Sequence, residues 1–328
     1  MPCELEQHDI GTFPGVTLLT KRTAPCMKPT AVYLPPKHVA SGNKLDVVIW
    51  LHGFYVRDHE FLFRNDPARI REQVRDSSKD VVLVAPFLGF EYAVDNGFTG
   101  NYSVNDLATP KWGERYLEEV IASISSFLAP VSGPPPQFQI GKLIIACHSG
   151  GGSGMRNLVG TLGKYQSSLK ACWGFDCLYG ARAQPDDATF WYQWLSGQNG
   201  CALEIIYGPT TLPQSVKLDL MGRGLATTEG NRTQPRRPAL KNLNVSMGHY
   251  DAFPAFGQMV RVNDLDPTFV DSFMIRQVSD EAPFKHKPMP QHGEFLRQAI
   301  ANIREAFPFP KDIHYMIARG GFSRLSKL

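Results

Sequence analysis

The sequence predicts an α/β fold in which a mostly parallel central sheet of about eight strands carries helices on both faces. Short apolar runs rich in Val, Ile and aromatic residues recur along the chain and end at Gly or Pro. From residue 46 onward these runs are continuously apolar, as expected for strands that are covered on both faces. Amphipathic segments with helical spacing separate the runs, which indicates that successive strands are parallel.

The expected elements follow from these patterns. The strands are predicted over 16–20, 30–34, 46–51, 81–87, 142–148, 170–175, 202–207 and 243–247. Apolar residues at i, i+3, i+4 and i+7 predict helices over 117–128, 155–162 and 296–303. The first two strands are close together in the sequence, so they are expected to be antiparallel neighbours at the edge of the sheet.

The chain shows no internal repeat and no linker, so residues 1–328 are expected to form one domain. The segment 208–242 is long, polar in its second half and rich in Gly and Pro, which predicts a lid or loop insertion. Residues 250–290 are similarly irregular. Both segments flank the last expected strand, so both are expected over the same end of the sheet. Residues 308–328 are expected to form a C-terminal tail.

Composition excludes some classes of function. The net charge is +3, from 34 basic and 31 acidic residues, and no basic tract is interleaved with aromatic residues, so nucleic acid is not an expected partner. No window approaches the length of a membrane span, and the N-terminus lacks the apolar segment of a secretory signal. The six cysteines lack metal-ligand spacing, so reduced, mostly buried thiols are expected. These features indicate a soluble intracellular protein.

The chain ends Ser326-Lys327-Leu328, a tripeptide that the peroxisomal import receptor reads as an address. In a eukaryotic source it predicts a peroxisomal protein with that receptor as a partner. In any other source the expected location is the cytoplasm.

The stretch LIIACHSGGGSGMRNL, residues 143–158, runs from an apolar strand through Ser149 and three glycines into an expected helix. The glycines either cradle a phosphate or clear space around a serine nucleophile. A P-loop needs a lysine followed by Ser or Thr after its glycines, and GGGSG fits a dinucleotide fingerprint only loosely. The pattern therefore favours a nucleophile, with a phosphate cradle or a structural glycine turn as alternatives.

The five residues Cys147-His148-Ser149-Gly150-Gly151 resemble the nucleophile elbow of the α/β-hydrolase superfamily, where a serine stands on a strained turn between strand and helix. Such an elbow needs small side chains two residues before and two residues after the serine. Gly151 meets this need. Cys147 stands where the family usually has glycine, and cysteine is small enough to fit.

The resemblance implies a triad in the chain order serine, acid, histidine. It places the base at His249, directly after the last expected strand, with a structural histidine as the alternative. The favoured acid is Asp176, at the end of the strand expected over 170–175. The family more often carries the acid after the following strand, where this chain has no carboxylate. Asp219 and Asp251 are the alternative acids, and a structural, capping role is the alternative for Asp176.

The resemblance also implies an oxyanion hole made by two backbone amides. One is the amide of Gly150, after the nucleophile. The other is expected from Phe54, because His52-Gly53-Phe54 follows the third expected strand and is similar to the family's oxyanion loop. Gly53 then forms the turn, and His52 orients the loop without acting as a base.

The implied activity is cleavage of a carboxylic ester or thioester of a small-molecule acyl substrate through an acyl-enzyme on Ser149, with no metal and no cofactor. Aromatic residues are expected to line the substrate site, with ordinary packing as the alternative: Tyr55, Trp112, Tyr179 and, within 190–194, Trp191. Basic residues in the expected lid could hold an anionic leaving group such as a coenzyme A phosphate, with a solvated loop as the alternative: Arg223, Arg232, Arg236 and Arg237. Two other functions stay open: an acyltransferase or cyclase with the same triad, and a catalytically silent binding module.

Overall fold

The computed structural model of the chain describes residues 2–8, 13–21, 25–36, 43–54, 56, 62–63, 70–89, 102–180, 183–197, 201–207, 211, 214–215, 217–218, 221, 245–249 and 325. The chain divides into two compact units, Met1–Cys172 with Gly321–Leu328, and Trp173–Gly320, and the division falls inside strand β7. The expectation of one domain over 1–328 stays a prediction.

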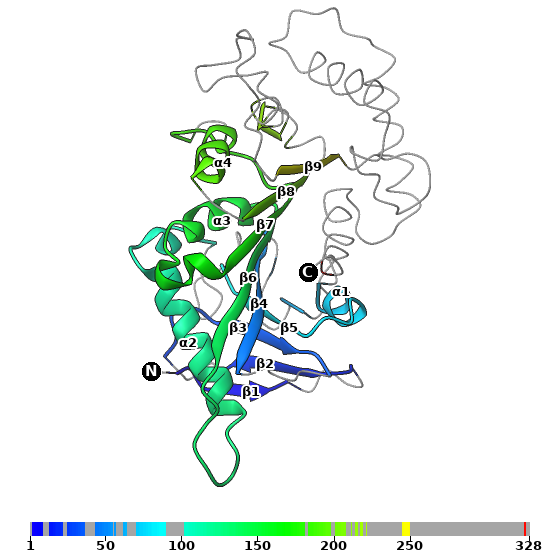
Figure 1. Ribbon diagram of the computed structural model, residues 1–328, viewed down its shortest axis with the longest axis vertical. Coiled ribbons are helices and arrows are strands. Elements are labelled where there is room, and N and C mark those ends of the chain that lie inside the picture. The colour runs from blue at the N-terminus through cyan, green and yellow to red at the C-terminus, as the bar shows by residue number, and fades with distance from the viewer. Residues whose placement is uncertain are drawn as a thin grey trace, which may run out of the picture. The chain divides into compact units, whose positions relative to one another are not determined.

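The first unit is built on a mixed sheet with the strand order β1-β2-β3-β5-β4-β6-β7 (Figure 1). β1, β2 and β3 pair antiparallel, β3 pairs antiparallel with β5, and β4 pairs parallel with β5 and β6. The strands are β1 (Leu5–Gln7), β2 (Val16–Thr20), β3 (Thr30–Leu34), β4 (Lys44–Leu51), β5 (Val81–Pro86), β6 (Gln139–His148) and β7 (Leu169–Phe175).

The edge of this sheet differs from the expectation. The strands predicted over 16–20 and 30–34 are antiparallel neighbours, as expected. The edge strand, however, is β1, which pairs outside β2. β1 has only 3 residues and the sequence LEQ, so it carries no apolar run that a sequence pattern could detect.

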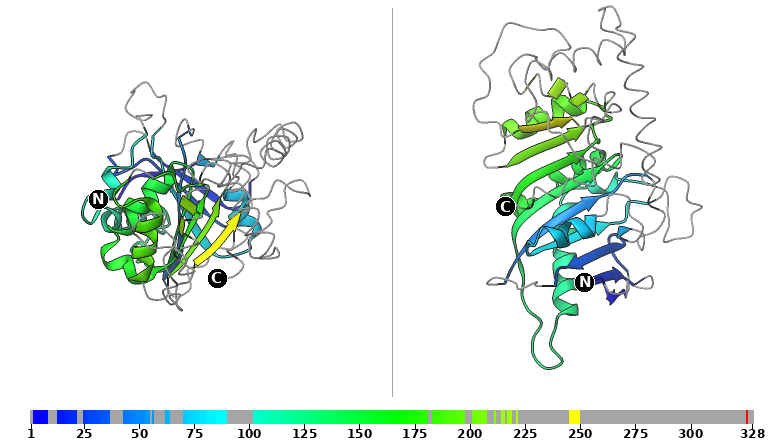
Figure 2. Two further views of the ribbon diagram at one scale, coloured as in Figure 1. Left: turned by 90° about the horizontal axis from the view of Figure 1, so that it is seen from above. Right: turned by 90° about the vertical axis from the view of Figure 1, so that its right-hand side faces the viewer.

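Helices cover both faces of the first unit's sheet. α2 (Trp112–Phe127) and α3 (Gly151–Val159) lie on one side, and α1 (Ile70–Asp76) lies on the other (Figures 1 and 2). α2 buries Leu117, Val120 and Ile124, the apolar stripe that predicted it. The predicted α/β architecture is therefore confirmed in this unit.

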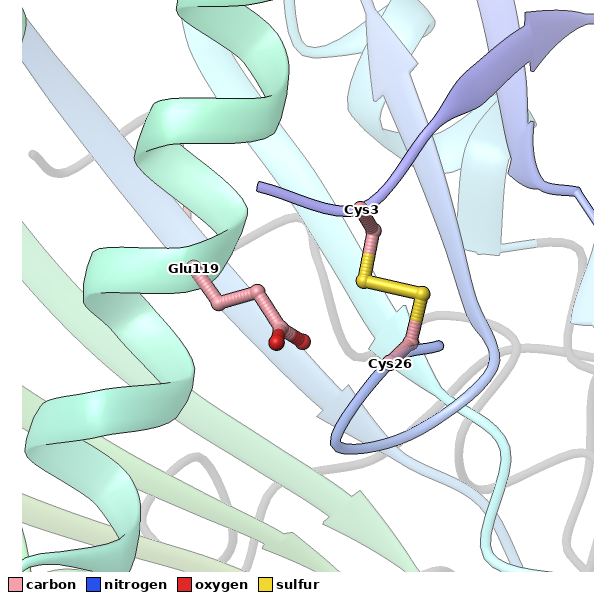
Figure 3. A group of neighbouring side chains, drawn as sticks. All are labelled: Cys3, Cys26 and Glu119. Carbon is pink, nitrogen blue, oxygen red and sulfur yellow. A yellow bond between two sulfur atoms is a disulfide. The ribbon is translucent and has the colours of Figure 1, made fainter. Parts of the chain in front are cut away.

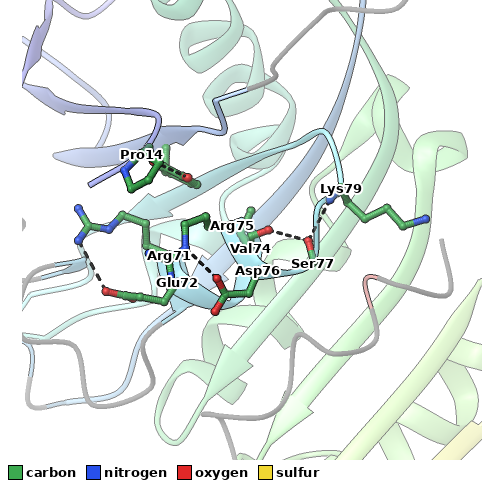
Figure 4. Close-up of polar contacts among 9 residues, drawn as sticks. Pro14, Arg71, Glu72, Val74, Arg75, Asp76, Ser77 and Lys79 are labelled. Atoms are coloured by element: carbon green, nitrogen blue, oxygen red, sulfur yellow. Dashed lines mark hydrogen bonds and ion pairs between the residues drawn. The ribbon is translucent and has the colours of Figure 1, made fainter. Parts of the chain in front are cut away.

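α1 was not expected from the sequence, and polar contacts at its C-terminal end stabilise it (Figure 4). The Arg75 Nε lies 2.7 Å from an Asp76 carboxylate oxygen. The Ser77 hydroxyl donates to the Val74 carbonyl at 2.6 Å, which satisfies one of the carbonyls that a helix end leaves free. The Arg71 guanidinium also lies 3.7 Å from the centre of the Phe13 ring, so α1 holds the segment before β2.

The second unit contains the rest of β7, then β8 (Ala202–Tyr207) and β9 (Val245–His249), in the order β7-β8-β9. β8 and β9 are parallel, and Tyr207 is the partner of His249. α4 (Asp187–Ser196) is capped by Asp186, whose side chain accepts a hydrogen bond from the Thr189 amide at 3.0 Å. Every strand that the sequence predicted is present in one unit or the other, with small shifts at the ends.

One pair of cysteines differs from the expectation. Cys3 and Cys26 form a disulfide beside Glu119 of α2, so the prediction that all six thiols are reduced is wrong for this pair (Figure 3). The reason is tertiary: 23 residues separate the two cysteines, and the β1–β2–β3 pairing brings their Cα atoms to 5.5 Å. The other four are free and buried, as expected: Cys147, Cys172, Cys177 and Cys201.

Several expectations lie outside the described residues. These are most of the lid at 208–242, the segment 250–290, the helix over 296–303, the arginines of the lid, the tail at 308–328 apart from the buried Leu325, and with the tail Ser326-Lys327-Leu328. Within the part of the chain that the structure describes, no helix has the length and apolar character needed to cross a membrane.

Candidate active site

The turn after β6 carries Ser149. β6 ends at His148 and α3 begins at Gly151, and Ser149 between them has φ 54°. This left-handed conformation costs a non-glycine residue about 1–2 kcal/mol, so it persists only where the surrounding structure enforces it. The strained strand–turn–helix that the sequence predicted at Ser149 is therefore present.

Two glycines after the serine make close contacts with the loop that follows β4. A Cβ added to Gly151 would lie 2.2 Å from the carbonyl oxygen of Leu51, the last residue of β4. A Cβ on Gly150 would lie 2.5 Å from the Phe54 ring. No side chain fits at Gly151, and a side chain at Gly150 would have to displace the Phe54 ring. Two residues before the serine, Cys147 is fully buried opposite Leu51, so a small thiol is accommodated where the family usually has glycine.

The loop after β4 lies against the serine. A Cβ on Gly53 would lie 2.8 Å from the Ser149 Cβ and 3.2 Å from its Oγ. The amides of Phe54 and Gly150 donate no hydrogen bond to any residue that the structure describes. The N-terminal end of α3, which starts two residues after the serine, adds the positive end of a helix dipole. The oxyanion hole expected from the amides of Phe54 and Gly150 stays a prediction.

His52 holds that loop in place. Its Nε2 accepts a hydrogen bond from the Leu88 amide at 2.8 Å, and its Nδ1 lies 2.6 Å from the Gly53 carbonyl oxygen. Because Nε2 accepts, the proton is on Nδ1 and is donated to that carbonyl. Burial lowers the pKa of His52 to about 4, so the ring is neutral at neutral pH.

The contacts of His52 limit its role and set the direction of the Phe54 amide. Both ring nitrogens of His52 are engaged, which supports an orienting role and no role as base. In a planar trans peptide the C=O and N–H point in opposite directions, so the Phe54 N–H points away from the His52 ring. The Tyr102 hydroxyl adds a third tie, a 3.1 Å hydrogen bond to the His52 carbonyl. Tyr102 lies outside every sequence motif, so this contact was not predicted.

The turn after β7 carries Asp176. This residue has φ 45° and is fully buried, and the Thr211 hydroxyl donates a hydrogen bond to its Oδ1. Among the described residues, five non-glycine residues have positive φ. Only Ser149 and Asp176 follow directly on a strand. The other three are exposed turn positions: Asn43, Ser78 and Lys111.

The remaining candidates are placed as follows. His249 is the last residue of β9. Asp219, Asp251 and Tyr55 lie outside the described residues.

The predicted aromatic walls fall into two groups. Trp112 and Trp191 are buried: Trp112 stacks on Tyr116 at 4.8 Å, and Trp191 meets the Phe190 and Trp194 rings edge-on. Tyr179 is 46% exposed, and Phe54, which was predicted only as an amide donor, is 36% exposed. These two therefore offer ring surface to a ligand, whereas Trp112 and Trp191 are occupied by packing. The substrate-binding roles of Trp112, Tyr179 and Trp191 stay predictions.

One group of described side chains has the donor types and spacing for a metal ion: Cys3, Cys26 and Glu119, whose ligand atoms lie within 4.8 Å of one another. The two sulfurs are bonded to each other, so neither is a thiolate ligand in this structure.

The comparisons with known proteins give likenesses to solved structures. No family model matches the chain, and a search of curated protein sequences finds no match. The chain is similar to an S-formylglutathione hydrolase from Agrobacterium tumefaciens, with 15% identity over 84% of this chain and 97% of that chain and a TM-score of 0.39. It is similar to a feruloyl esterase module from Clostridium thermocellum, with 12% identity over 76% and 86% and a TM-score of 0.43. It is also similar to an acetyl xylan esterase from Aspergillus awamori, with 13% identity over 70% and 83% and a TM-score of 0.40.

Proposed function

We propose that this chain has an α/β-hydrolase fold and is a serine hydrolase that cleaves a carboxylic ester or thioester through an acyl-enzyme on Ser149. The observation that carries the proposal is the strained backbone of Ser149, which is followed by two glycines in close contact with the loop after β4 and is faced by Gly53. Backbone strain of this kind costs stability and is a mark of functional sites. A merely structural turn at this position would be better served by glycine.

The proposed mechanism assigns each group one task. His249 takes the proton from the Ser149 hydroxyl as the oxygen attacks the acyl carbon. The negative charge that develops on the carbonyl oxygen is stabilised by hydrogen bonds from the amides of Phe54 and Gly150. His249 then protonates the leaving alcohol or thiol, and afterwards activates the water that releases the acid. Asp176 orients His249 and stabilises its protonated form.

We propose that Phe54 contacts the substrate. Its ring is 36% exposed and packs edge-on against Tyr102, with the ring centres 4.6 Å apart, so it is held beside the serine. We infer that the substrate carries an apolar or aromatic group on this side. Binding of an anionic leaving group by the lid arginines, and peroxisomal import through Ser326-Lys327-Leu328, stay proposals of the same kind.

A fluorophosphonate probe tests the proposal directly, because it reacts with activated serines. We expect the wild-type protein to be labelled and Ser149→Ala to lose both the labelling and the hydrolysis of aryl esters, with kcat/KM lower by about 10⁴-fold or more. Ser153→Ala is the matched control, because Ser153 is an exposed serine in the first turn of α3. It should keep full labelling.

Other outcomes separate the alternatives. Labelling that survives in Ser149→Ala would overturn the assignment of the nucleophile. A folded wild-type protein that never reacts would indicate a silent binding module. Product analysis with added alcohols or amines distinguishes hydrolysis from acyl transfer or cyclisation, since a transferase passes the acyl group to the added nucleophile in preference to water.

A further inference from the structure

Thr211 makes a contact that no part of the mechanism above uses. Its hydroxyl donates a hydrogen bond to Oδ1 of Asp176, although 35 residues separate the two in the chain. Both side chains are buried, with exposed fractions of 1% for Thr211 and 0% for Asp176. A hydroxyl on a carboxylate oxygen is a charge-assisted hydrogen bond, and it is stronger where water is excluded.

The segment around Thr211 is anchored independently of Asp176. The Thr211 carbonyl accepts a hydrogen bond from the Ser215 amide at 3.2 Å. The Gln214 side chain accepts from the Ala188 amide at 3.0 Å, and the Lys217 ammonium lies 2.7 Å from the Asp186 carboxylate. Since Ala188 and Asp186 belong to the first turn and the cap of α4, the helix fixes where Thr211 stands. The fold therefore holds the Thr211 hydroxyl next to the Asp176 carboxylate.

The contact has a geometric consequence. The χ2 torsion of an aspartate is broad, so a carboxylate with no fixed partner samples many orientations. A carboxylate has two oxygens that accept hydrogen bonds. A donor held on Oδ1 restricts the orientation of the group, because hydrogen bonds favour the plane of the carboxylate, and thereby restricts the directions in which Oδ2 can point.

We propose that Thr211 is a positioning residue for the catalytic acid. It holds Oδ1 of Asp176 so that Oδ2 faces the imidazole that assists Ser149. The loop after β8 has no carboxylate between residues 208 and 218, and it contributes this hydroxyl instead. The inference rests on the proposed function, because it assigns Thr211 through the role of Asp176.

The decisive variant is Thr211→Val, which keeps the shape of the side chain and removes the hydroxyl. We expect kcat/KM for an aryl ester to fall about tenfold through kcat, with KM nearly unchanged. We also expect the acidic limb of the pH–rate profile to move to lower pH, because the protonated imidazole loses the oriented carboxylate that stabilises it. Thr211→Ser keeps the donor and should recover most of the activity.

Thr189→Val is the matched control, since Thr189 is a buried threonine of α4 whose hydroxyl has no hydrogen-bond partner among the described residues. It should leave kcat/KM and the pH profile unchanged. In an Asp176→Asn background, Thr211→Val should cause no further loss, because the two residues act as one unit. Circular dichroism and thermal unfolding of each variant separate misfolding from mispositioning, and Thr211→Ser keeps the test valid if the valine variant fails to fold.

The outcomes keep the two proposals apart. If Ser149→Ala and Asp176→Asn abolish activity while Thr211→Val behaves like Thr189→Val, the positioning role is overturned and the hydrolase stands. If Asp176→Asn is fully active, the acid lies elsewhere and the inference fails with it. If Ser149→Ala keeps its activity, the proposed function itself fails.

Discussion

The turns after β6 and β7 place a polar residue in the same unusual conformation by different means. Ser149 has φ 54° and Asp176 has φ 45°. The serine turn is followed by Gly151, where the backbone of Leu51 leaves no room for a side chain, and by Gly150, which contacts the Phe54 ring. The aspartate turn has a side-chain contact instead, the hydrogen bond from Thr211. The turn at Ser149 can be predicted from the sequence, because its glycines are neighbours of the serine. The turn at Asp176 cannot, because Thr211 is distant from it in the chain.

The largest effect is expected from a substitution at Gly151. We expect Gly151→Ala to lower the free energy of unfolding by about 3 kcal/mol and to abolish fluorophosphonate labelling, because the new Cβ would lie 2.2 Å from a backbone oxygen that cannot move aside. Urea denaturation and labelling measure both effects. Gly160→Ala, at the other end of α3, is the control: its nearest neighbour is 3.8 Å away, so little change is expected. A stable, reactive Gly151→Ala protein would show that glycines do not enforce the serine turn.

The next prediction concerns how the free energy of unfolding depends on pH through His52, which holds the loop facing the serine. Its pKa is about 4 in the folded protein, against 6.5 for the unfolded chain, because burial disfavours the charged ring. The unfolded state therefore binds the proton first, so the stability that His52 contributes is complete above pH 6.5 and is lost as the pH falls towards 4. The loss is of the order of 3 kcal/mol at most.

The measurement is the free energy of unfolding in urea at several pH values between 7 and 4, for wild type and His52→Gln. The difference between the two proteins should shrink as the pH falls, since only the wild type carries the titrating ring. A difference that is constant over this range would contradict a neutral, buried His52.

The smallest expected effect is at Tyr102. Tyr102→Phe removes the 3.1 Å hydrogen bond to the His52 carbonyl and keeps the ring that packs on Phe54. We expect a loss of about 1 kcal/mol in unfolding free energy and a decrease of a few-fold in kcat. Tyr192→Phe in α4 is the control for removing one hydroxyl elsewhere. A loss as large as that of Gly151→Ala would mean that the hydroxyl, and not the close backbone packing, determines the loop.

The sequence predicted the parts of this protein whose physical cause is local. The strands expected over 46–51, 81–87 and 142–148 formed where a continuous apolar run must be covered on both faces, and α2 formed along its apolar stripe. The strained turn at Ser149 was predictable since its glycines are consecutive in the chain. β1 and α1 were missed because one is three residues long and the other seven, too short for a period to show.

The missed contacts share a different cause. The disulfide joins Cys3 to Cys26 through the pairing of three strands. Tyr102 reaches the His52 carbonyl from 50 residues away. Each of these pairs consists of ordinary residue types, and nothing near either partner in the chain marks it. Such contacts are visible only once the strands are assembled.

The sequence by itself thus determined the strand succession, the candidate nucleophile and the loop that faces it, since backbone conformation and burial impose residue types at neighbouring positions. Only the tertiary structure decided that His52 is a neutral ring that holds the loop through both nitrogens. It also decided that Cys3 and Cys26 form a disulfide and that Thr211 donates a hydrogen bond to Asp176. These contacts depend on which side chains, distant in the chain, come close enough to form a hydrogen bond or a disulfide. A pattern along the sequence does not specify such distances in space.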